Sequence, residues 1–118
     1  ILTIKGRKFN IKDYYEGITR FDFKDLCNKN IGSEDFIKIA KVCSFIIIEN
    51  LPNFNDNNSN QQQRFIILID IIYEKKIPLA ISGNSSLQEM TSASSLIEPF
   101  KRTTSRLYEL TSTKYDYL

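Results

Sequence analysis

Two arginines near the end of the chain have a spacing that suits the binding of an anion. Arg102 and Arg106 stand four positions apart, so in a helix their guanidinium groups share one face. A pair of guanidinium forks can bind a phosphate or a carboxylate through parallel hydrogen bonds. The same spacing fits surface salt bridges with Glu98 or Glu109, and from spacing alone salt bridges are the commoner outcome.

Two apolar runs end in polar residues that form a second candidate site. The run 46–48 is followed by Glu49, and the run 79–81 is followed by Ser82 and, after Gly83, by Asn84. Ligands of open α/β sheets collect at the carboxyl ends of strands, so these residues are candidates for binding a cofactor. An acid after an apolar strand is also the pattern with which P-loop enzymes hold magnesium. The alternative is that buried strands end in polar residues because they reach solvent there.

The composition excludes several classes of enzyme. The 118 residues include no histidine, which excludes Ser-His-Asp and Cys-His catalysis. Cys27 and Cys43 can form at most one disulfide and cannot supply a four-ligand metal site, so we expect reduced, buried thiols and no metal ion. The four glycines never cluster into a phosphate-binding loop, so a freestanding nucleotide hydrolase is not expected.

Charge and hydropathy limit the partners. A net charge of +2 is too small to indicate a nucleic acid, and we expect none. No apolar run approaches the roughly 18 residues that a membrane span needs. Ile1 already lies in a strand-like pattern, so we expect the chain to be a piece of a longer polypeptide.

The first part of the chain alternates apolar and polar residues. Residues 2–5, 8–12 and 18–23 show this alternation and predict a small N-terminal antiparallel sheet. Ser33 is a candidate N-cap for a helix over 34–42, whose apolar residues recur at helical spacing.

The second part of the chain predicts an α/β unit. The segments 44–49 and 77–82 are continuously apolar, which indicates strands buried on both faces as in a parallel sheet. Between them lie a polar Asn/Gln tract (residues 50–63), expected to begin as a loop, and a helix over 61–76 with a wide apolar face. Strand, helix and strand make a βαβ unit with parallel neighbours. Pro99 suits the first turn of a last helix over 100–112.

Four segments resemble the ZapE/AFG-type family of P-loop ATPases. Residues 17–27 resemble the motif GVARFDFxDLC, 31–36 resemble LGAxDY, 64–73 resemble RFIxLIDxLY, and 100–112 resemble FxRTxSRLxEMxS. The four motifs are collinear and span nearly the whole chain, so the match is specific. The chain departs from the family in the Asn/Gln tract, where residues 59–63 replace a charged RNEARR-type segment and leave Arg64 alone.

The resemblance implies that the chain is the C-terminal part of an AAA+-like P-loop ATPase. Residues 1–23 would be a small antiparallel β segment, and residues 24–118 an α/β C-terminal module. ATP and Mg²⁺ would bind the full-length protein, whereas this chain would bind neither alone and would be inactive alone. Arg102 and Arg106 become candidates for sensing nucleotide phosphate or for an arginine-finger role, and Arg64 is a weaker candidate for the same work.

The resemblance also implies a function and partners. The protein would couple ATP binding and hydrolysis to remodelling of partner proteins, in cell division or in protein quality control. The partners would be the upstream P-loop region, further copies of the chain, and division or mitochondrial membrane proteins. The compartment would be the bacterial cytoplasm or the mitochondrial matrix. The alternative is a non-catalytic protein-interaction module that binds through the Asn/Gln tract and the basic first twelve residues.

Overall fold

Three parallel strands organise the fold. The computed structural model describes residues 2–4, 7–9, 13–15, 17–27 and 30–111. The main sheet has the strand order β3-β4-β5-β6, in which β4, β5 and β6 run parallel and β3 pairs antiparallel with β4. The strands span Asp13–Tyr15 (β3), Ile18–Asp22 (β4), Phe45–Leu51 (β5) and Leu79–Gly83 (β6).

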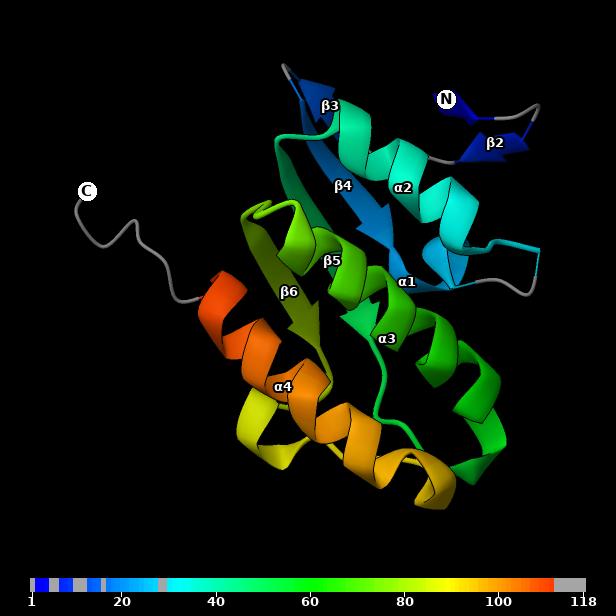
Figure 1. Cartoon of the computed structure of the whole chain (residues 1–118), viewed down its shortest axis with the longest axis vertical. Helices are drawn as coiled ribbons and strands as arrows, with labels where there is room; N and C mark the ends of the chain where they lie inside the picture. The colour runs from blue at the N-terminus through cyan, green and yellow to red at the C-terminus, as the bar shows by residue number, and fades with distance from the viewer. Residues whose placement is uncertain (1, 5–6, 10–12, 16, 28–29, 112–118) are drawn as a thin grey trace.

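Helices cover one face of this sheet. The helix α2 leads from β4 to β5, α3 leads from β5 to β6, and α4 follows β6. Figure 1 shows all three on the same side of the sheet. The helices span Phe23–Leu26 (α1, a single turn after β4), Ser33–Val42 (α2), Ser59–Glu74 (α3) and Ile97–Thr111 (α4).

The predicted βαβ unit is confirmed. Ile46 lies opposite Leu79 and Ile48 opposite Ile81 in parallel register, with α3 between the two strands in the chain. Ile46, Ile48 and Leu79 are buried beneath the helices. The apolar side chains of α3 and the β-branched strands therefore form one core, as their pattern indicated.

The expected separate N-terminal antiparallel sheet is not what the structure shows for residues 18–23. β1 (Leu2–Ile4) pairs antiparallel only with β2 (Arg7–Phe9), whereas β4 is an inner strand of the main sheet. The alternation in β4 was interpreted as that of a strand in a small antiparallel sheet. It arises instead because one face of β4 packs on the helices and the other does not. Lys5 and Lys12 of the basic first twelve residues lie outside the described residues.

The prediction that the parallel strands are buried on both faces is wrong for the face away from the helices. Phe45, Ile47 and Ala80 on that face are only half-buried, and Ile18 is 43% exposed. No helix of the described residues lies on this side, as Figure 1 shows. A parallel sheet usually has both faces covered, so this uncovered face is an unusual feature of the described fold.

Local signals start and end the helices close to the predicted positions. Ser33 is the first residue of α2 and Gly32 is the cap, one position before the expected Ser33 cap. The carboxylate of Asp35 accepts the Gly32 N–H at 3.0 Å, which stabilises the start of the helix. Pro99 lies in the first turn of α4, which begins at Ile97 rather than at residue 100.

Four phenylalanine rings fill the core beneath the carboxyl end of the sheet. The Phe54 ring lies 5.7 Å from that of Phe23, 5.6 Å from that of Phe65 and 5.5 Å from that of Phe100. These rings come from α1, the Asn/Gln tract, α3 and α4. Phe54 therefore anchors an otherwise polar segment to the core through tilted and edge-to-face contacts.

The Asn/Gln tract is held by hydrogen bonds to the 84–96 loop, which joins β6 to α4. Asp56 accepts from the backbone N–H and the hydroxyl of Ser94 at 2.7 and 3.0 Å. Thr91 donates to the Phe54 carbonyl at 2.7 Å. Two segments 37 to 38 positions apart at these contacts thus form one layer at the end of the sheet.

Gln62 is the buried centre of this layer. Its side chain is 0% exposed; Nε2 donates to Ser92 Oγ at 2.7 Å, and Oε1 accepts the Ala93 N–H at 2.9 Å. A buried amide needs such partners, because an unpaired polar group in the core costs free energy.

No helix of the described residues is long and apolar enough to cross a membrane.

We predict that Gln62→Leu lowers the free energy of unfolding of the chain by about 1–3 kcal/mol, because the Ala93 N–H loses its acceptor. Urea denaturation measures the change. The matched control is Gln63→Leu, since Gln63 is the exposed neighbour on α3 and its change should stay within about 0.5 kcal/mol. An equal loss of unfolding free energy in the two variants would show that the Gln62 amide does not stabilise the contact between α3 and the 84–96 loop.

Candidate functional site

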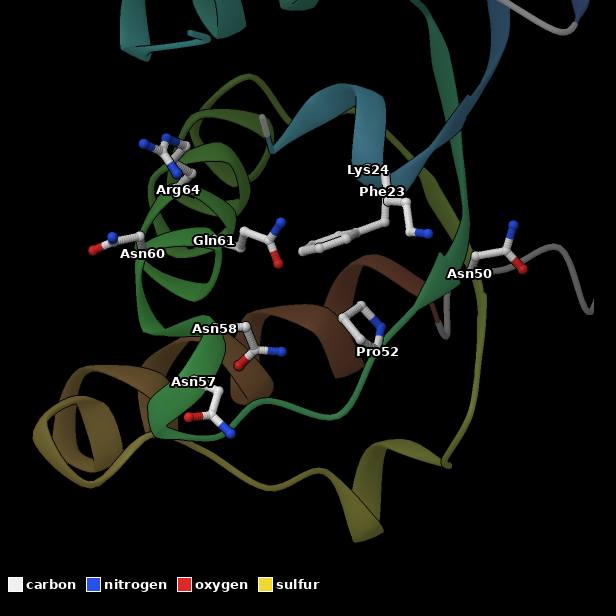
Figure 2. Close-up of a pocket in the computed structure, with 9 residues that line it drawn as sticks. All are labelled: Phe23, Lys24, Asn50, Pro52, Asn57, Asn58, Asn60, Gln61 and Arg64. Atoms are coloured by element: carbon white, nitrogen blue, oxygen red, sulfur yellow. The ribbon is translucent and has the colours of Figure 1, made fainter. Parts of the chain in front are cut away.

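A cavity lies at the carboxyl ends of β4 and β5, beside the start of α3. It has a volume of about 630 Å³, within the usual range of ligand sites. Figure 2 shows the lining residues around it, with Gln61 and Asn58 directed toward Phe23 and Pro52. Five lining residues carry carboxamides, two are cations and two are apolar: Asn50, Asn57, Asn58, Asn60, Gln61, Lys24, Arg64, Phe23 and Pro52.

Local capping fixes the wall formed by the Asn/Gln tract. Asn55 Oδ1 accepts the Asn57 N–H at 2.8 Å, and Asn58 Oδ1 accepts the Asn55 N–H at 2.8 Å. Asn58 Nδ2 also donates to the Asn53 carbonyl at 3.1 Å. These bonds form a short 3₁₀ turn over Asp56–Asn58 that leads directly into α3. Asparagine suits these positions because its side chain hydrogen-bonds nearby backbone groups.

The end of β5 forms the opposite wall through an irregularity in the sheet. The β5–β6 register shifts between Ile48 and Leu51, and Asn50 takes a φ of 62°. Asparagine tolerates this left-handed conformation better than most residues. Its Nδ2 donates to Asp22 Oδ1 at 2.6 Å, which joins the ends of β4 and β5.

Of the strand-end residues predicted from sequence, Glu49 lies on the sheet face away from the helices. Its carboxylate is 3.6 Å from Nε of Arg20 on β4. Arg20 and Glu49 alternate with the buried residues of their strands, which directs both side chains away from the core. Glu49 is therefore beside the cavity in sequence, but it is not among the cavity's lining residues.

Ser82 and Asn84 are exposed at the end of β6 and do not line the cavity. The Asn84 N–H donates to the Leu51 carbonyl at 3.2 Å. The chain approaches so closely here that a Cβ at Gly83 would lie 2.4 Å from the Leu51 carbonyl oxygen, so only glycine fits. Arg64, a candidate from the family resemblance, lines the cavity, whereas the sequence analysis did not single out Lys24, Asn50 and Gln61. The Asn/Gln tract was the available signal for two of these three.

Arg102 and Arg106 both bind one carboxylate, that of Asp70 on α3. Arg106 Nη1 donates to Asp70 Oδ1, and Arg102 Nη2 lies 3.7 Å from Oδ2. The partner is neither Glu98 nor Glu109, because Lys101 binds Glu98 at 2.9 Å and Glu109 accepts from Tyr73. The two arginines thus join α4 to α3.

Tyr73 completes this contact between the two helices. The Arg106 guanidinium lies 4.6 Å from the centre of the Tyr73 ring, a cation–π contact. The Tyr73 hydroxyl donates to Glu109 Oε1 at 2.9 Å, and this bond together with the Glu109 charge raises the pKa of Tyr73. Arg106 has a 25% exposed side chain and Arg102 a 55% exposed one, so Arg106 is the more tightly held of the two.

The two cysteines are buried free thiols, as predicted. Burial raises the pKa of Cys27 and of Cys43, and Cys43 also hydrogen-bonds Thr19 at 3.1 Å. Thiols of this kind are unreactive at neutral pH. Among the residues that the structure describes, no group of three His, Cys, Asp or Glu side chains could hold a metal ion.

Comparison with known proteins identifies relatives of the chain. The sequence model of the AFG1-like ATPase family matches residues 1–117. Lactation elevated protein 1 homolog B of Danio rerio is 27% identical over 90 residues, which cover 76% of this chain and 18% of that protein. Cell division protein ZapE of Escherichia coli (strain K12) is 28% identical over 93 residues, which cover 79% of this chain and 25% of that protein.

These matches concern only a part of each relative. The chain spans a quarter or less of the length of the two proteins. No solved structure matches the chain.

We predict that Arg106→Ala lowers the free energy of unfolding of the chain by about 1–3 kcal/mol, because it removes a charge-assisted bond and a cation–π contact. Arg102→Ala should cost less than about 1 kcal/mol, as expected for an exposed ion pair. Urea denaturation of both variants measures the difference. A larger loss for Arg102→Ala would contradict the assignment of Arg106 as the main link between α3 and α4.

Proposed function

The chain belongs to the AFG1-like ATPase family, and we propose that it is the part of an ATP-driven protein that couples ATP binding and hydrolysis to the remodelling of partner proteins. In this proposal ATP and Mg²⁺ are held by a P-loop region upstream in the longer polypeptide. ATP hydrolysis there supplies the free energy, and this chain is inactive alone. The family assignment supports the use of a nucleotide, and the sequence of this chain contains no phosphate-binding loop.

The uncovered face of the sheet is the observation that carries the proposal. Ile18, Phe45 and Ile47 form an apolar patch there, beside the Arg20–Glu49 ion pair. Apolar surface on a parallel sheet is a place where another part of a protein packs. We propose that the upstream P-loop region covers this face, so that changes at the nucleotide reach the sheet directly.

A nucleotide-sensing role falls to Arg102 rather than to Arg106 in this proposal. Asp70 and Tyr73 engage Arg106, whereas Arg102 is more exposed and its contact with Asp70 is longer. α4 lies on the helical side of the sheet, opposite the uncovered face (Figure 1). Arg102 would therefore contact the phosphates of a neighbouring copy in an oligomer, with Arg106 positioning α4.

We propose protein clients in cell division or in protein quality control, in the bacterial cytoplasm or the mitochondrial matrix. The name of one bacterial relative refers to cell division, which supports the first of these alternatives, and another relative is an animal protein.

The cavity favours a second candidate function, that of a non-catalytic protein-interaction module. Its lining of amides and two cations suits contact with a polar partner. The two candidates differ in one measurable respect, because only the first makes ATP turnover depend on residues of this chain.

We predict that Ile18→Glu in the longer protein lowers ATP turnover by about tenfold or more, because a charge on the uncovered face opposes packing of the P-loop region. Ile67→Glu is the matched control, since Ile67 is 39% exposed on α3 against 43% for Ile18. A steady-state ATPase assay measures both. Equal turnover in the two variants would contradict the proposed packing and favour the interaction module.

We predict that Arg102→Ala in the longer protein lowers ATP turnover by about 10³-fold or more, the scale of an arginine that stabilises transferred phosphate. Arg102→Lys should restore only part of the rate, because a lysine lacks the bidentate fork. Lys101→Ala is the control, as Lys101 is an exposed neighbour paired with Glu98. Unchanged turnover in Arg102→Ala would remove this role.

A further inference from the structure

We propose that the cavity at the start of α3 binds an extended, acidic peptide segment of a partner protein. The cavity combines a dense set of carboxamides with two cationic side chains, and none of its nine lining residues is acidic. Neither the family assignment nor the relatives assign a role to this cavity.

The hydrogen-bonding capacity of the lining matches a peptide backbone. A primary amide has one acceptor and two donors, so it can pair with the N–H and the C=O of one peptide unit. Within the described residues, the side chains of Asn60 and Gln61 make no hydrogen bond, so their groups are available to a ligand. Figure 2 shows Gln61 directed into the cavity from the first turns of α3.

The positive charge of the lining favours a negatively charged ligand. Lys24 is exposed, and its amino group makes no hydrogen bond or ion pair among the described residues. Arg64 adds a second positive charge on α3. Asp22, the acid bonded to the lining residue Asn50, accepts from Asn50 and from the Lys24 backbone N–H and does not pair with the Lys24 amino group. Carboxylates of Asp or Glu on the ligand can therefore pair with the amino group of Lys24.

Two features favour a peptide over a nucleic acid or a nucleotide. Nucleic-acid affinity depends on many phosphate contacts from Lys and Arg, whereas this cavity has two cations and five amides. Bases also need an exposed ring for stacking, but Phe23 is 2% exposed and packs against Phe54 and Phe65. The amides therefore indicate recognition of backbone groups.

This inference deepens the proposed function, because it names the contact with the partner protein. It rests on that function only in taking the peptide from a partner. Peptide binding to the chain needs no nucleotide, so it is measured separately from ATP turnover in the longer protein. A failure to bind the peptide would not contradict the role in ATP turnover, and unchanged ATP turnover would not contradict peptide binding.

Fluorescence polarisation tests the proposal with labelled glutamate-serine, asparagine-serine and lysine-serine peptides of equal length and the full 118-residue chain. The acidic peptide should bind at least about tenfold more tightly than the other two, because only its charges complement the cavity. Lys24→Glu and Gln61→Ala should each weaken its binding by about tenfold, the scale of one good polar contact.

Matched surface variants separate the cavity from a general charge effect. Lys38→Glu changes an exposed lysine on α2, and Gln63→Ala changes an exposed glutamine on α3; neither residue lines the cavity. Both should leave acidic-peptide binding within about twofold, as expected for residues outside a binding site. Equal effects of Lys24→Glu and Lys38→Glu, or equal binding of all three peptides, would overturn the proposal. Tighter binding of single-stranded DNA, ATP or inorganic phosphate than of the acidic peptide would also overturn it, in favour of a phosphate site.

Discussion

The packing of Phe54 against three other phenylalanine rings is the contact on which the end of the molecule beside the carboxyl edge of the sheet depends. Phe54 is fully buried although it lies within a tract of asparagines and glutamines. Its ring brings α1, α3 and α4 together at one point. The polar residues around this point hydrogen-bond to one another or to the 84–96 loop, or they face the cavity. The cavity wall is therefore supported by an apolar contact beneath it.

The periodic elements could be predicted from sequence, and their long-range polar partners could not. α3 and the strands β5 and β6 followed from apolar spacing, because burial imposes a repeat on each element. The Asn/Gln tract was predicted to begin as a loop, from its polar composition. Its order depends on Gln62 meeting Ser92 and Ala93, about thirty residues later, which composition does not reveal. The uncovered face was missed for a related reason. A run of β-branched residues indicates a parallel strand, but it does not show whether the packing partner lies within the same chain.

The partner of the arginine pair also could not be predicted from sequence, because it lies far away along the chain. Spacing placed Arg102 and Arg106 on one helix face and suggested partners on that helix, since neighbours one turn away are the nearest in sequence. The structure instead brings Asp70 from α3, thirty-six positions from Arg106. One carboxylate faces two guanidinium groups, and Tyr73 holds a second carboxylate, that of Glu109, at the same contact. The Arg106 side chain is 25% exposed and that of Arg102 is 55% exposed, so Arg102 is the more accessible of the two.

The layer formed by the Asn/Gln tract and the 84–96 loop is built mostly from hydrogen bonds that do not depend on pH. Carboxamides and hydroxyls do not titrate, so the bonds of Gln62, Ser92 and Thr91 are the same in acidic and in neutral solution. The layer contains two acids, Asp56 and Glu89, and the backbone and side-chain hydrogen bonds from Ser94 lower the pKa of Asp56. Asp56 therefore stays ionised further into the acid range than a free carboxyl group. Since the chain has no histidine either, no imidazole of this layer gains a charge between neutral and mildly acidic solution.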